Sequence, residues 1–421
     1  KIVFSLKLTK IVDLFNRHKK VVENYFFMTV LQVINSLFYV MIYPYLIRTL
    51  GAESYGLYIY ALSIVTYFIF IVNFGFDLPA TKAVALENDN PTAIANVLSC
   101  IFTAKIYLLF VSVLIFSILL ITVPFLREHY LLFMIVFGQT INFALFPSYY
   151  YQGMQKMKTA TIIQVVFKLL SLPFIFVLVK SSSDLSVFAI ISTSTMIIGG
   201  LVAILMVVFV DKLNIRWVSF LELKKWFKEA FPFFLSNSVG TLKEQGIPII
   251  VGAFFGMRDV AIYDLANKLI IIPRTVLMSL NAALFPKIVK DNNKATIRKI
   301  IKYEFLIGFA VIALIIAFGY WVILFLGGEK MTDAYPLAIV LSVTVLSWLV
   351  VGAIISFLFI PNHKYYLVTI NQIIALAAVA VFILLGFSIK ISIFVLVGSL
   401  AFSGIMEIIF CLYQTKKYKF L

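Results

Sequence analysis

Twelve long apolar stretches constrain the fold of this chain more than any other feature of its sequence. A helix that crosses the hydrocarbon core of a bilayer needs about 20 mostly apolar residues. Charged residues, glycines and prolines divide the chain into segments of about that length. The predicted spans are 24–48, 54–78, 97–123, 128–150, 159–180, 185–210, 229–255, 259–286, 303–326, 334–359, 365–387 and 391–413. The predicted fold class is therefore an all-α polytopic membrane protein with twelve transmembrane helices.

The composition agrees with this class, because 62% of the 421 residues are hydrophobic and only 13% are charged. An ordinary soluble domain is about half apolar and about a quarter charged. These proportions exclude a water-soluble enzyme and a nucleic-acid-binding domain. The net charge of +16 therefore favours loops that face anionic membrane lipids, with no nucleic-acid partner. No metal-ligand spacing, phosphate-binding glycine loop or pair of nucleophile and base is visible in the sequence, so we expect neither an enzyme nor a bound metal or cofactor.

The lysines and arginines predict the orientation of these spans. If the first residues lie inside the cell, the inner connectors hold 24 of these residues and the outer connectors hold 6. Such residues accumulate on the cytoplasmic side, so we expect both termini in the cytoplasm. Segment 1–23 carries a helical stripe of apolar side chains beside its basic residues, which predicts an interfacial helix rather than a signal peptide. A frayed basic tail is the alternative.

The chain also repeats itself at an offset of 205 residues, so that Gly51 aligns with Gly256 and Tyr58 with Tyr263. Coincidence in a sequence of low complexity is the alternative. A repeat of six spans predicts two six-helix lobes of the same orientation, related by a pseudo-two-fold axis along the membrane normal. The predicted domains are a basic interfacial helix (1–23), an N-lobe (24–210), a basic interfacial linker helix (211–228) and a C-lobe (229–421).

Polar residues inside the predicted spans gather on the first two helices of each half. Ionisable residues at membrane depth are costly and usually face the bundle interior or a water-filled cavity. The polar faces are Gln32, Ser36, Tyr39 and Tyr43 in the first span; Tyr60, Ser63, Tyr67 and Asp77 in the second; Asn237, Thr241, Lys243 and Glu244 in the seventh; and Asp264, Asn267, Lys268 and Arg274 in the eighth. Four such faces predict a central cleft between the lobes.

Several of these residues also have a purely structural interpretation. Asp264 and Lys268 are four residues apart and could form a buried pair that only locks one helix. Lys105 and Lys168 are close enough to predicted span ends for their amines to reach the membrane surface. Arg274 is harder to explain in this way. It lies near the middle of the bilayer, and its nearest carboxylate by helical geometry, Asp264, already faces Lys268. Basic groups at that depth favour a secondary transporter with an anionic cargo.

Five short motifs resemble a known family. They are Leu-Gly-Ala-Glu-Ser-Tyr-Gly at 50–56, Asn-Phe-Gly-Phe at 73–76, Pro-Ser-Tyr-Tyr-Tyr-Gln-Gly at 147–153, Ile-Tyr-Asp-Leu-Ala-Asn-Lys at 262–268 and Gly-Gly-Glu at 327–329. Their order and spacing resemble the Wzx-type polysaccharide or O-antigen flippases of the multidrug/oligosaccharidyl-lipid/polysaccharide exporter superfamily. The resemblance extends over nearly the whole chain.

The resemblance implies a cleft lined by the first, second, seventh and eighth spans, and alternating access. The implied cargo is an undecaprenyl-pyrophosphate-linked oligosaccharide, moved from the inner to the outer leaflet of the bacterial cytoplasmic (inner) membrane. Coupling to a proton or sodium ion is implied, and the expected partners are membrane lipids and the glycan polymerase and glycosyltransferase machinery. Candidate cargo-binding residues are Arg274, Lys268, Lys243, Arg48, Asn267, Gln32, Tyr39, Tyr43, Tyr60 and Tyr67. Candidate ion-coupling residues are Asp264, Glu244 and Asp77.

Three other functions remain open at this point. A drug/cation antiporter of the same fold would need a net acidic cleft, whereas the four cleft helices carry four basic and three acidic residues. A lipid II or teichoic-acid-type flippase would differ only in its cargo. A membrane scaffold for glycan assembly enzymes would leave the charges at the midplane unexplained.

Overall fold

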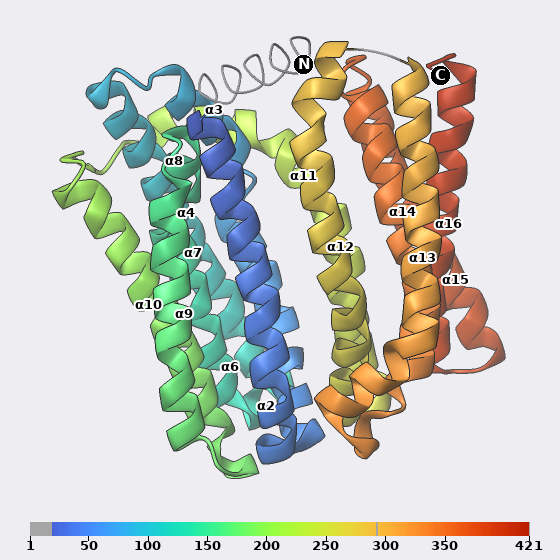
Figure 1. Cartoon of the computed structure of the whole chain (residues 1–421). Coiled ribbons are helices and arrows are strands. Elements are labelled where there is room, and N and C mark those ends of the chain that lie inside the picture. Colours follow the sequence, from blue (N-terminus) through green and yellow to red (C-terminus); the bar gives the residue numbers. More distant parts are fainter. Residues whose placement is uncertain (1–18, 292–293, 421) are drawn as a thin grey trace, which may run out of the picture.

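The computed structural model of this chain describes residues 19–291 and 294–420. Within those residues every regular element is a helix, as the sequence predicts. Figure 1 shows two groups of helices side by side, one formed by residues 19–209 and the other by residues 220–417. The predicted two-lobe architecture is therefore confirmed. Most of the predicted interfacial helix at 1–23 lies outside the described residues.

The helices follow the predicted order. The N-lobe contains α2 (Lys19–Asn73), α3 (Asp77–Leu86), α4 (Pro91–Thr122), α5 (Pro124–Glu128), α6 (Tyr130–Phe137), α7 (Gln139–Leu145), α8 (Ser148–Gly153), α9 (Met157–Leu178), η1 (Ser182–Asp184) and α10 (Leu185–Phe209). The C-lobe contains α11 (Phe220–Phe255), α12 (Met257–Asp291), α13 (Lys294–Gly327), η2 (Glu329–Met331), α14 (Ala334–Ile354), η3 (Ile355–Phe359), α15 (Tyr365–Ile389) and α16 (Ile393–Lys417).

The repeat has a structural counterpart in two glycines. Gly51 divides α2 into the first and second predicted spans, with φ 78° and ψ 163°. Gly256 separates α11 from α12, the seventh and eighth spans, with φ 100° and ψ 174°. This backbone region is essentially restricted to glycine. Both lobes thus begin with a pair of helices joined at a glycine of the same conformation, and we refer to this side of the molecule as the Gly51 end.

Nine helical segments within the described residues are apolar and long enough to cross a membrane. One of them, Phe26–Leu86, contains two predicted spans. Helices α11 and α12 are long enough, but both carry charged residues at mid-length. Together these helices account for the twelve predicted spans.

Two predicted elements differ in the structure. The span at 128–150 is not one helix, because α6 and α7 meet at Gly138 and α8 starts again after Pro147. The linker helix predicted over 211–228 is wrong in its first half, since residues 212–219 are not helical and α11 begins at Phe220. The backbone N–H of Arg216 donates to Ser99 Oγ at 3.0 Å, so α4 supplies a hydrogen bond that a helix would otherwise make.

The apolar cores show where the lobes are joined. At the Gly51 end, Leu50 and Tyr55 of α2 share one core with Val251 of α11 and Tyr263 of α12. Towards the opposite end each lobe has a core of its own, and the first turns of α11 contribute Leu223 to that of the N-lobe. The lobes are therefore packed together at the Gly51 end and have separate cores at the end where α2 starts and α16 finishes (Figure 1).

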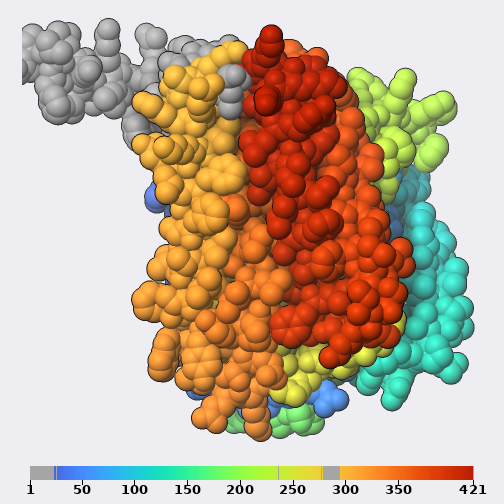
Figure 2. Space-filling model, turned by 90° about the vertical axis from the view of Figure 1, so that its right-hand side faces the viewer, coloured from blue at the N-terminus to red at the C-terminus, as the bar shows by residue number. Residues whose placement is uncertain are grey.

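The outer face of the C-lobe is strongly apolar. Figure 2 shows this face, formed by α13, α15 and α16. Large apolar side chains are exposed along these helices, among them Phe309, Phe318, Trp321, Leu384 and Leu385. A patch of this kind would be unusual on a soluble monomer, whereas in a bilayer it contacts lipid chains. The chain is a multi-pass membrane protein.

Candidate functional site

The predicted central cleft is present as two cavities on either side of Lys268. The larger one, the N-lobe cavity, has a volume of about 550 Å³ and lies among α2, α9, α10 and α12. The smaller one, the C-lobe cavity, has a volume of about 180 Å³ and lies among α2, α11, α12, α14 and α16. Lys268 lines both cavities.

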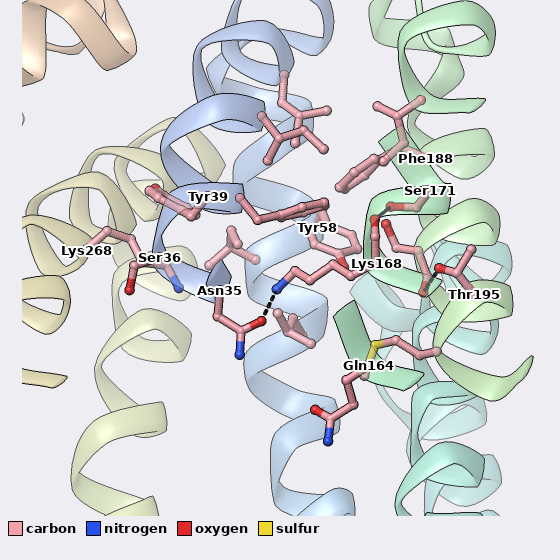
Figure 3. Close-up of a pocket in the computed structure, with 18 of the residues that line it drawn as sticks. Asn35, Ser36, Tyr39, Tyr58, Gln164, Lys168, Ser171, Phe188, Thr195 and Lys268 are labelled. Carbon is pink, nitrogen blue, oxygen red and sulfur yellow. Dashed lines mark hydrogen bonds between the residues drawn. The ribbon is translucent and has the colours of Figure 1, made fainter. Parts of the chain in front are cut away.

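The N-lobe cavity has a mixed lining. Apolar side chains such as Ile42 and Phe188 are interrupted by polar groups from four helices. Among the polar residues are Gln32, Asn35, Ser36, Tyr39, Tyr58, Gln164, Lys168, Ser171, Ser192, Thr195 and Lys268. Figure 3 shows Lys168 and Lys268 approaching this space from opposite sides, with Asn35 and Ser36 between them. Amides and hydroxyls that face a cavity inside a membrane protein are suited to hydrogen bonding with a polar ligand.

Asp264 connects the lobes at the edge of these cavities. Asp264 is only 7% exposed. Its Oδ2 accepts a hydrogen bond from Tyr55 Oη at 3.1 Å and a longer one from Tyr39 Oη at 3.4 Å. Lys268 Nζ lies 3.8 Å from Asp264 Oδ1, so the pair expected from their spacing is present. Tyr43 packs between the two tyrosines, with ring centroids 5.0 and 5.2 Å away. A carboxylate of the C-lobe is thus held by phenols of the N-lobe.

Arg274 has a different partner from the one that helical geometry indicates. Its Nη2 donates to Glu244 Oε1 of α11 at 3.3 Å, and not to Asp264. The centre of its guanidinium lies 3.3 Å from the centroid of the Trp348 ring on α14, which is a favourable cation–π position. The sequence predicts Asp264 as the nearest carboxylate to Arg274. This prediction is wrong because α11 runs beside α12 and brings Glu244 closer to the guanidinium.

Lys243 is also paired. Its Nζ donates to Glu407 Oε1 at 2.5 Å, and the two side chains are only 11% and 10% exposed. This contact joins α11 to α16 and supplies the partner of Glu407, which the sequence did not identify. The C-lobe cavity is therefore lined by basic residues whose charges are compensated by carboxylates.

Eight of the predicted site residues line these cavities. Gln32, Tyr39 and Lys268 line the N-lobe cavity, and Lys243, Glu244, Asp264, Asn267, Lys268 and Arg274 line the C-lobe cavity. The remaining five, Arg48, Tyr43, Tyr60, Tyr67 and Asp77, line neither.

These five residues have other surroundings. Arg48 is exposed near the Gly51 end, and Tyr43 is fully buried. Tyr60 packs against the rings of two phenylalanines, and the Tyr67 hydroxyl donates to a backbone carbonyl of α11 at 3.4 Å. Asp77 starts α3, where it accepts a hydrogen bond from Ser148 Oγ at 3.2 Å.

Sequence reasoning missed the polar face of α9. Gln164, Lys168 and Ser171 follow helical spacing and all line the N-lobe cavity. The same periodicity that identified the other polar faces would have found this one. The position of Lys168 near a predicted span end favours an amine that reaches the membrane surface, whereas in the structure this amine turns inward towards Asn35 (Figure 3).

In the described part of the chain, no group of three or more His, Cys, Asp and Glu side chains is placed to hold a metal ion.

The sequence of this chain is similar to those of known proteins. The family model for "polysaccharide biosynthesis protein" matches residues 21–291. An Escherichia coli (strain K12) protein named "Putative O-antigen transporter" is 26% identical over 266 residues, which are 63% of this chain and 64% of that protein. A Shigella dysenteriae protein of the same name is 27% identical over 270 residues, 61% of this chain and 64% of the relative. The chain thus spans 64% of the length of the curated relatives that it matches.

Solved structures with this arrangement of helices are also known. The inward-facing conformation of a multidrug resistance MATE family transporter of the MOP superfamily matches with a TM-score of 0.68 and 14% identity, over 92% of this chain and 94% of that one. The lipid II flippase MurJ in an inward closed conformation matches with a TM-score of 0.59 and 13% identity, over 93% and 86% of the two chains. At these identities the likeness establishes the fold.

Proposed function

This chain belongs to the family of polysaccharide biosynthesis proteins, and from that membership we propose that it is a flippase for a lipid-linked oligosaccharide. It would move this cargo from the inner to the outer leaflet of the bacterial cytoplasmic membrane, with both termini in the cytoplasm. The proposed cargo is an undecaprenyl-pyrophosphate-linked oligosaccharide, and the proposed energy source is a proton or sodium gradient. The names of the two curated relatives support a glycan cargo.

The N-lobe cavity is the observation that carries this proposal. Its volume of about 550 Å³ is within the range of ligand sites, roughly 300 to 1,000 Å³. A bundle that served only as a scaffold would fill such a space with apolar side chains, because protein interiors are close-packed and polar groups at membrane depth are costly. Amides from α2 and α9 and hydroxyls from α9 and α10 match the hydroxyl groups of a sugar.

The packing of the lobes supports alternating access. Their shared core lies at the Gly51 end, and core residues such as Tyr55 and Ile59 also line the cavities. Towards the opposite end each lobe has a core of its own. If the basic connectors face the cytoplasm, the described conformation is closed on the outer side. Export would then require the contacts at the Gly51 end, including those of Asp264, to break while the opposite end closes.

The proposed roles follow the positions of the side chains. Lys268, Arg274 and Lys243 would attract the anionic part of the cargo. Arg48, Asn267 and Gln32 would bind its polar groups, and Tyr39, Tyr43, Tyr60 and Tyr67 would contact its sugars. Asp264, Glu244 or Asp77 would carry the coupling ion. Of the three basic residues near the midplane, Lys268 is the one that reaches both cavities.

A reconstitution experiment tests this function. The purified full chain would be placed in vesicles that contain a fluorescent polyprenyl-pyrophosphate oligosaccharide, and arrival of the glycan on the opposite leaflet would be measured with an impermeant lectin. We expect transport by the native chain and its loss in the Lys268→Ala, Arg274→Ala double variant. Lys390→Ala, which removes an exposed charge at the start of the α15–α16 connector, is the matched control.

The alternatives predict different outcomes of the same assay. Efflux of a cationic dye without glycan movement would favour the drug/cation antiporter. Movement of lipid II or a teichoic-acid precursor in preference to other glycans would reassign the cargo. Absence of any translocation by well-folded native protein would favour the membrane scaffold.

A further inference from the structure

The five basic residues inside the predicted spans differ in how their charge is compensated. Four of them have a carboxylate oxygen within 4.0 Å: Lys105 with Asp77 at 3.9 Å, Lys243 with Glu407 at 2.5 Å, Lys268 with Asp264 at 3.8 Å and Arg274 with Glu244 at 3.3 Å. Lys168 has no such partner among residues 19–291 and 294–420. An uncompensated charge at membrane depth is costly, so the presence of Lys168 inside a span is not explained by an ion pair.

The contacts of Lys168 leave donors free. Its Nζ donates to Asn35 Oδ1 at 2.7 Å and lies 4.6 Å from the centroid of the Phe38 ring. An ammonium group has three hydrogen-bond donors, and both neighbours are uncharged. Lys168 lines the N-lobe cavity, so its remaining donors are available to a group bound there.

A second ammonium group faces the same cavity. Lys268 lines this cavity together with Lys168, and the two enter it from opposite sides (Figure 3). The lining residues of this cavity include no aspartate or glutamate. Asp264, the partner of Lys268, lies outside the lining and is already bonded to Tyr39 and Tyr55.

From this arrangement we propose that Lys168 and Lys268 form an anion subsite of the N-lobe cavity, which takes a phosphoryl group of the cargo. The inference rests on the proposed function for the identity of the cargo, and it adds a residue of α9 that the cleft helices do not supply. Asn35 would position the Lys168 amine through its hydrogen bond.

Phosphoryl chemistry fits this site for two reasons. A phosphate or pyrophosphate presents several anionic oxygens, so one group can accept hydrogen bonds from two separated ammonium groups at once. Lysine binds phosphate as a compact charge on a flexible stem, and such a stem can follow a group that moves. A bound phosphoryl group would also supply negative charge to a cavity whose lining includes two lysines and no carboxylate.

The C-lobe cavity is a poorer anion site. Lys243 and Arg274 already have carboxylate partners, and the same cavity contains Glu244 and Asp264. An anion entering it would have to displace a carboxylate or approach one. The excess positive charge of the cleft is therefore on the N-lobe side, where the amides and hydroxyls that would bind the adjoining sugar also lie.

Binding of inorganic pyrophosphate to the purified full chain in detergent tests the subsite without any need for transport. Calorimetry would compare the native chain with Lys168→Gln and Lys268→Gln. The loss of a charged hydrogen bond predicts binding at least about tenfold weaker in each variant. Lys168→Arg, which keeps the charge, is expected to retain most of the affinity.

Lys158→Gln is the matched control, because it removes an exposed lysine from the first turn of the same helix. It is expected to bind pyrophosphate like the native chain. Thermal unfolding of every variant would show that weaker binding does not reflect misfolding. If Lys168→Gln fails to fold, the other two variants still test the subsite. The proposal requires that Lys168→Arg binds pyrophosphate and that Lys268→Gln binds it weakly.

Two further probes identify the source of the anion. A short-chain polyprenyl phosphate tests a phosphoryl group on a lipid carrier, and glucuronate tests the carboxylate of an acidic sugar. Binding of both phosphorylated probes with dependence on Lys168 supports the proposal. Binding of glucuronate alone, equal binding by Lys168→Gln and Lys158→Gln, or no pyrophosphate binding by the native chain would overturn it. Those results would leave the flippase function standing if the native chain still moves its cargo in vesicles.

Discussion

Tyr55 of α2 donates a hydrogen bond to Asp264 of α12 at 3.1 Å, across the boundary between the two lobes. The carboxylate belongs to one lobe and its phenol donors to the other, so this contact can persist only while the lobes are together at the Gly51 end. Because Asp264 is buried, loss of a donor leaves a charged oxygen without a replacement from water.

Replacement of Tyr55 by phenylalanine is expected to weaken closure of the lobes. Removal of the hydroxyl from a buried carboxylate costs about 1.5–3 kcal/mol, so the closed conformation should lose at least about tenfold in population relative to an open one. Spin labels on the exposed residues Glu53 and Arg258, one from each lobe, would report the distance distribution. Tyr130→Phe, on an exposed tyrosine of α6, should leave the distribution unchanged.

Gly56 is expected to tolerate no side chain in the closed conformation. A Cβ atom at this position would lie 1.7 Å from the backbone oxygen of Met257 in the other lobe, and neither backbone can yield without separation of the lobes. Gly56→Ala should therefore increase the distance between the same two labels and lower the temperature of unfolding. Gly352→Ala is the control, since nothing lies within 4 Å of that position and alanine favours a helix by about 1 kcal/mol.

The buried pair of Lys243 and Glu407 is expected to matter most when only one partner is lost. Lys243→Met leaves the Glu407 charge uncompensated and should lower the free energy of unfolding by about 3–5 kcal/mol. The double variant with Glu407→Met should recover most of this loss. A thermal unfolding series would measure both. Equal destabilisation by Lys243→Met and by Lys225→Met, whose pair with Glu229 is exposed, would contradict the assignment, because exposed pairs contribute below about 1 kcal/mol.

The coupling ion is expected to depend on the carboxylates that line a cavity. Asp264→Asn or Glu244→Gln should reduce the dependence of transport on an imposed proton or sodium gradient, because both side chains line the C-lobe cavity. Asp77→Asn should have a smaller effect, since Asp77 lies at the start of α3 beside Lys105. Transport in vesicles with and without each gradient would distinguish them, with the exposed Glu53→Gln as control. A dominant effect of Asp77→Asn would contradict this ranking.

The sequence was a reliable guide to the spans and to the repeat. Both depend on local properties: the length of an apolar stretch sets whether it can cross a bilayer, and a glycine marks a backbone conformation that other residues avoid. Gly51 and Gly256 could therefore be aligned from the sequence, and the structure gives them the same conformation. Helical periodicity likewise placed Asp264 beside Lys268.

The sequence was a poor guide to contacts between helices. Lys243 and Glu407 are 164 positions apart, and no helical periodicity relates them. Helical spacing relates Arg274 only to carboxylates of its own helix, although its partner Glu244 lies on α11. The inward direction of Lys168 depends on Asn35, which α2 brings against α9. The sequence shows that each of these residues is polar and inside a span, but not which way it turns.

The amino-acid sequence alone thus determined that this chain is a helical membrane protein of two similar halves with polar faces on the leading helices. Hydropathy, helical spacing and glycine conformation are properties of short segments, so they can be inferred before the fold is known. Only the tertiary structure decided which charges neutralise one another, which tyrosines hold Asp264 and which lysine faces the cavity without a carboxylate. Charge compensation falls off over a few ångströms, and distances on that scale are set by the way whole helices pack.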